Sequence, residues 1–282
     1  MAGRTGGLLP AVSFAAVLLV LLGVAFLLVR NRLNDGAVPR ARSLLVAGTP
    51  RTVLAIWAHP DDEITSAGTL AAMARDGAQV ILIYLTRGEA ARDTGYGRED
   101  LARVRGLEAQ AAGATLRAHA VEVFEWPDGG LSATDGEAVK GVLRKRIAHW
   151  KPSVLISFDE RIGYYGHPDH VATGRWAREL AQEENSIRRL YQATLPRALI
   201  QIALKLVAAF RDNYPSDPQA GLPAPTVAVP IARFATTKRR LLDVHASQAK
   251  VIADVQPGYD KLPAWLYYRL FDREYFALAV DR

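Results

Sequence analysis

The chain has 282 residues, enough for one or two domains, and its 50% hydrophobic and 23% charged composition excludes disordered, collagen-like and low-complexity classes. Five Arg within residues 1–42 account for most of the net charge of +6, and the remaining 30 basic against 28 acidic residues give no reason to expect nucleic acid as a partner. Because Cys is absent, disulfides, thiol nucleophiles and thiolate metal sites are excluded, and any metal must be held by His and carboxylates.

The first feature along the chain is an apolar segment, Leu8 to Val29, which contains no charged residue. Its length is close to the roughly 20 helical residues that cross a bilayer. A secretory signal peptide is the alternative, but its apolar region would be shorter and a small-residue cleavage site would follow it, whereas Arg30-Asn31-Arg32 follows here. We therefore predict that residues 1–30 are an N-terminal transmembrane anchor.

Basic residues flank this segment unequally. Arg4 lies before it, and Arg30, Arg32, Arg40 and Arg42 lie after it. Because basic residues concentrate on the cytoplasmic side of a membrane span, we expect a single-pass membrane protein whose catalytic domain is cytoplasmic.

The rest of the chain divides into a linker and one domain. Residues 31–50 mix Pro, Gly, Asn and Arg without a regular period and are expected to be a linker, followed by a domain over residues 51–282. Short apolar runs predict buried strands at Thr52 to Trp57, Val80 to Leu85, Ala118 to Phe124 and Val154 to Phe158. Helical patterns with stop signals lie between them, at Thr65 to Asp76 before Gly77, Glu99 to Ala112 before Gly113, and Asp135 to Trp150 before Lys151-Pro152. This alternation predicts an α/β, Rossmann-like fold whose mostly parallel sheet has helices on both faces.

A polar cluster, Ala58-His59-Pro60-Asp61-Asp62-Glu63, follows the first predicted strand directly. Ligands of open α/β sheets bind beyond the carboxyl ends of strands. Crowded carboxylates repel one another unless a cation stabilises them, and His with Asp is a ligand set that suits zinc. The alternative is a polar turn in which Asp61 or Asp62 caps the next helix.

A second polar cluster follows the fourth predicted strand, where His167-Pro168-Asp169-His170 opens a helical pattern that runs to Glu184. A helix cap or a core histidine is the alternative explanation for such a pair. Taken together, however, the two clusters offer His59, Asp62 and His170 as three protein ligands. Three ligands leave one coordination position for water, which is typical of catalytic zinc.

These two motifs resemble those of the LmbE-like, or PIG-L, zinc-dependent N-acetylglucosaminyl deacetylases, whose signatures stand here as AHPDDE at 58–63 and HPDH at 167–170. Further matches are Thr86-Arg87-Gly88-Glu89, Arg105 with Glu108, Pro127 to Leu131, and His245-Ala246-Ser247-Gln248. The resemblance spans roughly residues 52 to 250 in order. It implies that the protein is a zinc-dependent N-deacetylase.

The resemblance also implies a role for each matching residue. The metal ligands would be His59, Asp62 and His170, which bind Zn²⁺, with Fe²⁺ or another divalent ion as the alternative. The catalytic residues would be Asp61 as general base, His167 at the developing tetrahedral centre, Asp169 as the group that orients His167, and Tyr165 at the amide carbonyl. The substrate-binding residues would be Asp128, which contacts sugar hydroxyls, Arg105, which holds substrate or only forms a salt bridge, and Arg87.

Elementary electrostatics supports this division of roles. Adjacent side chains such as Asp61 and Asp62 diverge, so one ligand and one base is the natural arrangement. We expect His167 to be cationic, and the opposite charge of Asp169 would raise its pKa for that purpose.

We therefore expect a hydrolase that removes acetyl from an N-acetylglucosamine-type group on a glycolipid, glycoside or thiol-cofactor precursor. Its partners would be this substrate, either free or linked to a lipid, and the membrane, which the N-terminal helix would span. The alternatives are an amidase acting on a different amide, a phosphoesterase, and a noncatalytic membrane-tethered sugar-binding relative. The amphipathic stretch Ala198 to Phe210 is expected in the core, with an interfacial helix or substrate lid as the alternative, and Tyr214 to Pro230 is expected to be a loop or edge strand.

Overall fold

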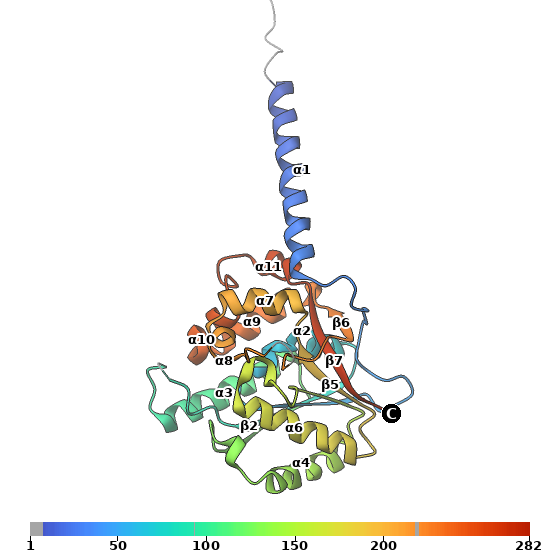
Figure 1. Ribbon diagram of the computed structural model, residues 1–282, viewed down its shortest axis with the longest axis vertical. Coiled ribbons are helices and arrows are strands. Elements are labelled where there is room, and N and C mark those ends of the chain that lie inside the picture. Colours follow the sequence, from blue (N-terminus) through green and yellow to red (C-terminus); the bar gives the residue numbers. More distant parts are fainter. Residues whose placement is uncertain (1–7, 93, 218–219) are drawn as a thin grey trace, which may run out of the picture.

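The computed structural model describes residues 8–92, 94–217 and 220–282, which form a long N-terminal helix and an α/β body (Figure 1). Helix α1 (Leu8–Leu33) projects away from the body, with its C-terminal end at α7 and α11. Its segment Phe14–Leu33 has a mean hydropathy of 2.3 and is unburied, so it is long and apolar enough to cross a membrane, a test that a signal sequence also passes. Arg4, on which the expected orientation partly rests, lies outside the described residues.

The described residues of the body form a seven-stranded sheet with the order β3-β2-β1-β4-β5-β7-β6. Strands β1 to β5 are mutually parallel, and β7 runs antiparallel to its neighbours β5 and β6. The strands are β1 (Thr52–Trp57), β2 (Gln79–Thr86), β3 (Ala120–Trp126), β4 (Val154–Ser157), β5 (Arg189–Thr194), β6 (Val227–Pro230) and β7 (Arg273–Asp281). The first four coincide closely with the predicted runs. The predicted α/β class with a mostly parallel sheet is confirmed.

The strands β5 and β7 were not predicted, because polar residues interrupt their apolar pattern. Those polar groups are paired in the fold. The amide of Gln192 in β5 donates to Glu160 at 2.6 Å. The carboxylate of Glu274 in β7 accepts the backbone N–H groups of Gly68 and Thr69 at 2.9 and 2.7 Å. Such long-range partners are not visible in a local sequence window.

Helices cover both faces of the sheet, as predicted. One face packs under α2 (Ala67–Arg75), α3 (Arg98–Leu116), α9 (Ala235–Val244) and α11 (Ala264–Leu270), with Trp57 in its core. The other face packs under α4 (Gly136–Trp150) and α6 (Pro168–Glu183), with Trp176 in its core. Asp135 caps α4 by accepting the N–H of Glu137 at 2.9 Å.

The predicted end of α3 at Gly113 is wrong, because the helix continues to Leu116 and closes with Arg117 in a left-handed conformation. Gly113 is needed for packing instead. A Cβ there would lie 2.2 Å from the Val121 side chain, so glycine lets α3 approach β3 closely.

The predicted helix Ala198 to Phe210 is two helices, α7 (Arg197–Leu206) and α8 (Ala208–Asn213), because Val207 between them has the extended angles φ −110° and ψ 117°. The remaining helices are short. They are α5 (Gly163–Gly166), α10 (Ala249–Val255) and the 3₁₀ turns η1 (Asp62–Thr65), η2 (Leu131–Ala133), η3 (Ala232–Phe234) and η4 (Ala246–Gln248).

Residues 31–50, which we expected to be a linker, lie against the body. Asn34 donates to the carbonyl of Leu270 at 2.6 Å, and Arg40 forms a β-bridge with Ala228. Leu44 is 1% exposed and belongs to the main core. The segment lacks a regular period, but its side chains and backbone have partners in the body. The division of the chain into anchor, linker and deacetylase domain stays a prediction.

Candidate active site

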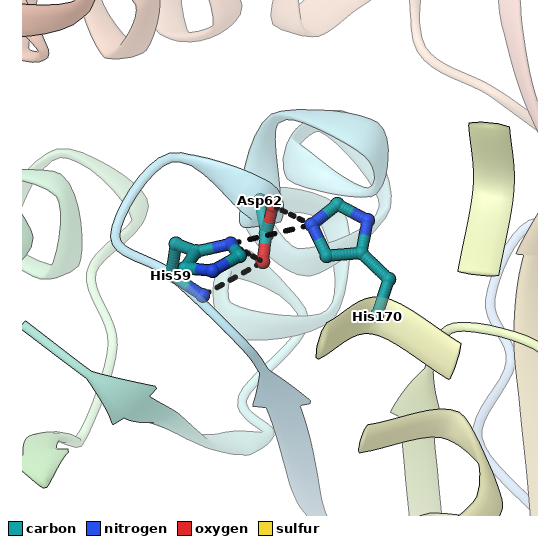
Figure 2. Close-up of side chains that lie close together, drawn as sticks. All are labelled: His59, Asp62 and His170. Carbon is teal, nitrogen blue, oxygen red and sulfur yellow. Dashed lines mark hydrogen bonds and ion pairs between the residues drawn. The ribbon is translucent and has the colours of Figure 1, made fainter. Parts of the chain in front are cut away.

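The two histidine motifs meet at one edge of the sheet. Strands β1 and β4 are parallel neighbours, so the turn after β1 and the segment that leads from β4 to α6 leave the sheet at the same edge. Figure 2 shows His59 and Asp62, which come from the turn after β1, pointing toward His170 of α6. The topology therefore brings together residues that are more than a hundred positions apart in the chain.

The three predicted metal ligands are close enough to share one ion. His59 Nδ1 lies 3.3 Å from His170 Nε2, and Asp62 Oδ1 lies 3.1 Å from the same His170 nitrogen. Asp62 Oδ2 lies 3.5 Å from His59 Nδ1. One ligand atom from each residue falls within 4.8 Å of the others, and all three residues are buried. This group could hold a metal ion.

The ring nitrogens on the far sides of both histidines also have partners. His170 Nδ1 lies 3.0 Å from the carbonyl oxygen of Gly163. His59 Nε2 lies 3.0 Å from Asp128 Oδ1 and 3.4 Å from Asp169 Oδ2. Carbonyl and carboxylate partners of this kind fix the tautomer of a metal-binding histidine and leave its other nitrogen free as a ligand.

The electrostatics of the group favour a cation at its centre. Burial lowers the pKa of His59, but hydrogen bonds to Asp128, Asp169 and Asp62 outweigh it and hold that pKa well above the usual value. Burial alone would raise the pKa of Asp62, whereas the facing histidines hold it well below the usual value. The surroundings therefore stabilise positive charge between an ionised carboxylate and two imidazole nitrogens, which fits a divalent ion.

Asp61 is held beside the ligand group in a strained backbone conformation. Its φ of 120° lies in a region that residues other than glycine rarely adopt. The N–H of Asp61 donates to Glu63 Oε2 at 3.1 Å, and Arg105 lies 3.0 Å from Asp61 Oδ2. Asp61 makes no side-chain capping bond to η1, so the capping alternative does not describe it. Burial raises its pKa to about 6, although Arg105 opposes the rise.

The motif His245 to Gln248, near the C-terminus, contacts the first histidine motif through Glu63. His245 Nε2 lies 2.5 Å from Glu63 Oε1, and both side chains are fully buried. Glu108 accepts the N–H and the hydroxyl of Ser247 at 2.8 and 2.7 Å. His245 thus holds the Glu63 carboxylate, which accepts the backbone N–H of Asp61. Glu108 holds Ser247 of the same motif.

His167 differs from the expectation that it is cationic. Burial, together with the neighbouring imidazoles His170 and His59, lowers its pKa to about 4. His167 is the N-cap of α6, and its Nδ1 accepts the N–H of Asp169 at 3.2 Å. A neutral ring with Nδ1 as acceptor carries its proton on Nε2.

The carboxylate of Asp169 makes its hydrogen bonds elsewhere than to His167. It accepts the N–H groups of Gly129 and Leu131 at 2.8 and 3.0 Å and lies 3.4 Å from His59 Nε2, while its backbone N–H donates to His167. One of its oxygens still lies within 4.8 Å of a His167 ring nitrogen, so its role toward His167 stays a prediction. The reason is geometric: an N-cap side chain bonds to the backbone at the start of its helix. Asp169 therefore orients the His59 ring and the loop that contains Gly129.

Aromatic rings and one carboxylate fix the second motif. Phe158 stacks on His170 with ring centroids 4.1 Å apart, and Tyr165 packs edge-on against the same ring at 5.1 Å. Asp159 accepts the backbone N–H groups of Arg161, Ile162 and Tyr164. Phe158 and Asp159 follow β4 directly. They hold His170 and the loop before His167, a function that the sequence analysis did not assign to them.

The three predicted substrate-binding residues occupy different environments. Asp128 lines the cavity but faces His59, and its other oxygen accepts the N–H of Ala90 at 2.6 Å. Arg105 is 3% exposed and bonds to Asp61 and to the carbonyls of Pro60 and Gly88. Arg87 lies near Glu99 and Glu125 at 3.7 and 3.8 Å and is not among the described residues that line the cavity.

A cavity of about 610 Å³ opens over the ligand group. Its polar end contains His59, Asp61, Asp62, Arg105, Asp128, Tyr165, His167 and His170. Its other walls are mostly apolar side chains of α7, α8, α10 and α11, together with Leu33 of α1. We expected the stretch Ala198 to Phe210 in the core, with an interfacial helix or substrate lid as the alternative. Ala203, Val207 and Phe210 are buried, but Leu199, Ile202 and Leu206 line the cavity. The apolar spacing along the helix does not by itself distinguish a core from a cavity wall.

Comparisons with known proteins agree with this geometry. A family model described as PIG-L, GlcNAc-PI de-N-acetylase, matches residues 54–181, a span that includes both histidine motifs. A 1D-myo-inositol 2-acetamido-2-deoxy-alpha-D-glucopyranoside deacetylase from Nakamurella multipartita is 30% identical over 80% of this chain and 91% of its own length.

Solved structures share the fold. The N,N'-diacetylchitobiose deacetylase from Pyrococcus horikoshii superposes with a TM-score of 0.57 at 21% identity, covering 81% of this chain and 83% of that one. A 4-carboxy-2-hydroxymuconate hydratase from Pseudomonas putida also has a TM-score of 0.57, at 17% identity and covering 82% and 97% of the two chains. Since a hydratase shares the fold, the fold alone does not decide the reaction. The sequence match and the family model together show that the chain belongs to the PIG-L family of de-N-acetylases.

Proposed function

We propose that the protein is a metal-dependent hydrolase that removes the N-acetyl group from an N-acetylglucosamine-type substrate. The observation that carries this proposal is the convergence of His59, Asp62 and His170 within 4.8 Å, beside Asp61 and at the end of a large cavity. The name of the Nakamurella relative, a deacetylase of an acetamido-glucopyranoside, supports the same reaction for this chain.

We propose Zn²⁺ as the ion, with Fe²⁺ or another divalent ion as the alternative. Two imidazole nitrogens and one carboxylate oxygen are a ligand set that zinc accepts, and three protein ligands leave a position for water. With zinc held by these residues, the pKa of a water bound there would be lowered to about 7.

Asp61 would take the proton from the attacking water and return it to the amine nitrogen as the C–N bond breaks, which releases acetate and the free amine. A general base works best when its pKa lies near the working pH, and burial raises the pKa of Asp61 to about 6. Arg105, 3.0 Å away, and the N–H bond to Glu63 fix its position. We propose that Arg105 acts here by holding the base and the turn around Pro60, while contact with the substrate is left to the cavity-facing residues.

His167 and Tyr165 would act on the carbonyl oxygen of the acetamide. Because His167 Nδ1 already accepts the N–H of Asp169, its Nε2–H is free to donate to the oxyanion that develops when water adds. We propose that it donates as a neutral imidazole, in contrast to the cation expected from sequence. Tyr165 lines the same cavity, and burial raises its pKa, so its hydroxyl remains a donor.

The membrane part of the proposal rests on α1. We propose that this helix anchors the chain as a single-pass span, with the body on the cytoplasmic side, because Arg30 and Arg32 follow its apolar segment. At its base Arg30 pairs with Asp272 of the body. We further propose that the acetylated amino sugar is linked to a lipid, since an anchored enzyme works at a membrane surface.

An acetate-release assay tests this function. The full chain, reconstituted in lipid nanodiscs and loaded with Zn²⁺, is expected to release acetate from N-acetylglucosamine glycosides, and the release should stop on chelation. The same preparation is tested on other N-acyl amides. Turnover of those amides without any acetate from the sugars would replace the deacetylase proposal with an amidase, and bound metal without turnover of either would contradict catalysis.

A further inference from the structure

The apolar end of the cavity is formed by one face of α7 opposite α10, α11 and the end of α1. Leu199, Ile202 and Leu206 line it from α7, and Val251 and Val255 line it from α10. On α7 only Ala203 is buried, and Leu206 is 64% exposed. An amphipathic helix normally buries its apolar face against a core, whereas this face borders open space.

This apolar space is continuous with the metal-ligand group, because both belong to the same cavity. Whatever fills the apolar end therefore shares one cavity with the metal-ligand group. Three of the charged groups that line the cavity are paired: Lys238 lies 2.5 Å from Glu274 and donates to the carbonyl of Ile64 at 3.1 Å, and Arg273 lies 2.6 Å from Asp272. The surface left for a ligand at this end is thus mostly apolar.

The cavity also reaches the membrane helix. Leu33, in the last turn of α1, lines it, and α7 and α11 both contact α1. Figure 1 shows α7 and α11 at the base of α1, on the side of the body from which that helix projects. A chain that leaves the cavity past Leu33 would run toward the hydrocarbon layer that α1 is long enough to cross.

We propose that the apolar end of this cavity binds a hydrocarbon chain of the substrate, so that the acetylated sugar reaches the metal site while its lipid remains in the membrane. This inference rests on the proposed deacetylase function. It assigns α7, α10 and the end of α1 to binding the lipid part, and the two histidine motifs to the sugar part.

The test compares N-acetylglucosaminides that carry methyl, octyl and dodecyl groups, using the full chain in nanodiscs. Complete burial of one methylene strengthens binding by roughly fourfold. We therefore expect the KM of the dodecyl glycoside to be at least tenfold below that of the methyl glycoside, with kcat similar for both. Equal KM values for all three glycosides would overturn the inference while leaving the deacetylase function intact.

Two matched variants separate binding in the cavity from partition into the bilayer. Leu206→Glu places a charge in the cavity wall. Leu107→Glu places a charge on α3, outside the cavity, at a leucine of similar exposure (61% against 64%). We expect Leu206→Glu to raise the KM of the dodecyl glycoside at least fivefold without changing that of the methyl glycoside, and Leu107→Glu to change neither. Equal effects of the two variants would contradict a chain-binding site.

A binding measurement keeps the test independent of turnover. Radiolabelled dodecyl N-acetylglucosaminide is titrated into wild-type nanodiscs and into nanodiscs with either variant. Weaker binding only to Leu206→Glu supports the chain site even if no acetate is released, in which case the deacetylase proposal alone has failed. Identical binding to all three preparations overturns the chain site.

Discussion

At one end of the cavity, His59, Asp62 and His170 are 7%, 8% and 1% exposed, whereas at the other end Leu206 and Val251 are 64% and 47% exposed. The ligand histidines of the polar end are held by a backbone carbonyl and by carboxylates at their second ring nitrogens. These residues come from short motifs that follow strands. The apolar end is a set of helix faces that meet without filling the space between them. The first arrangement fixes a reacting group in place, and the second leaves room for a flexible chain.

The largest expected effect is removal of the metal from the polar end. His170→Ala deletes one of three protein ligands, so we expect metal binding to be lost and kcat/KM to fall at least about 10³-fold, as when a central catalytic group is removed. Chelation of the wild type should have the same effect, and added Zn²⁺ should restore only the wild type. Metal content and acetate release, measured on the same sample, check this.

Asp61→Asn tests the division of labour between the two adjacent carboxylates. We expect kcat to fall about 10²- to 10⁴-fold, the usual contribution of a general base, with metal content unchanged. Asp62→Asn is the matched variant and should lose metal as well as activity. If Asp61→Asn lost metal to the same extent, Asp61 would be a ligand and the assigned base would be wrong.

Asp128→Asn distinguishes the observed contact with His59 from the role in sugar binding that the family resemblance implies. A carboxylate that orients a ligand histidine is worth about 10- to 100-fold in metal affinity. We expect that loss, with KM for the methyl glycoside nearly unchanged at saturating metal. The opposite result, a raised KM with normal metal affinity, would return Asp128 to the sugar.

The smallest effect is expected on stability at the apolar end. Leu206→Ala removes a side chain that is 64% exposed and borders the open cavity. The free energy of unfolding should therefore change by less than about 0.5 kcal/mol. In contrast, Leu70→Ala in the core beneath α2, where the side chain is fully buried, should cost about 2 to 5 kcal/mol. Urea denaturation of both variants checks the difference. A loss of several kcal/mol at Leu206 would mean that its face is ordinary core.

The polar end could be predicted from sequence because each motif is contiguous and follows a strand. The turn 58–63 and the segment 167–170 needed only the parallel order of β1 and β4 to meet. The charge state of His167 could not be predicted, because it depends on the burial of its ring and on the proximity of His170 and His59 in the fold. The contact of His245 with Glu63 joins residues 182 positions apart and has no local signal.

The sequence could not decide between core and cavity wall at the apolar end, for a different reason. The spacing of Leu199, Ile202 and Leu206 shows which face of α7 is apolar but not what it faces. The two-helix form of this region depends on the extended conformation of Val207, and the strand β7 is stabilised by partners of Glu274 in α2 and α9. Tertiary contacts therefore decide both features.

X-ray absorption at the zinc edge, recorded on the purified full chain, tests the central claim most directly. The account predicts one zinc per chain, bound by two nitrogens and one carboxylate oxygen at about 2.0 to 2.2 Å together with a water oxygen, and predicts that His170→Ala abolishes this signal. A metal environment that is unchanged in His170→Ala would contradict it.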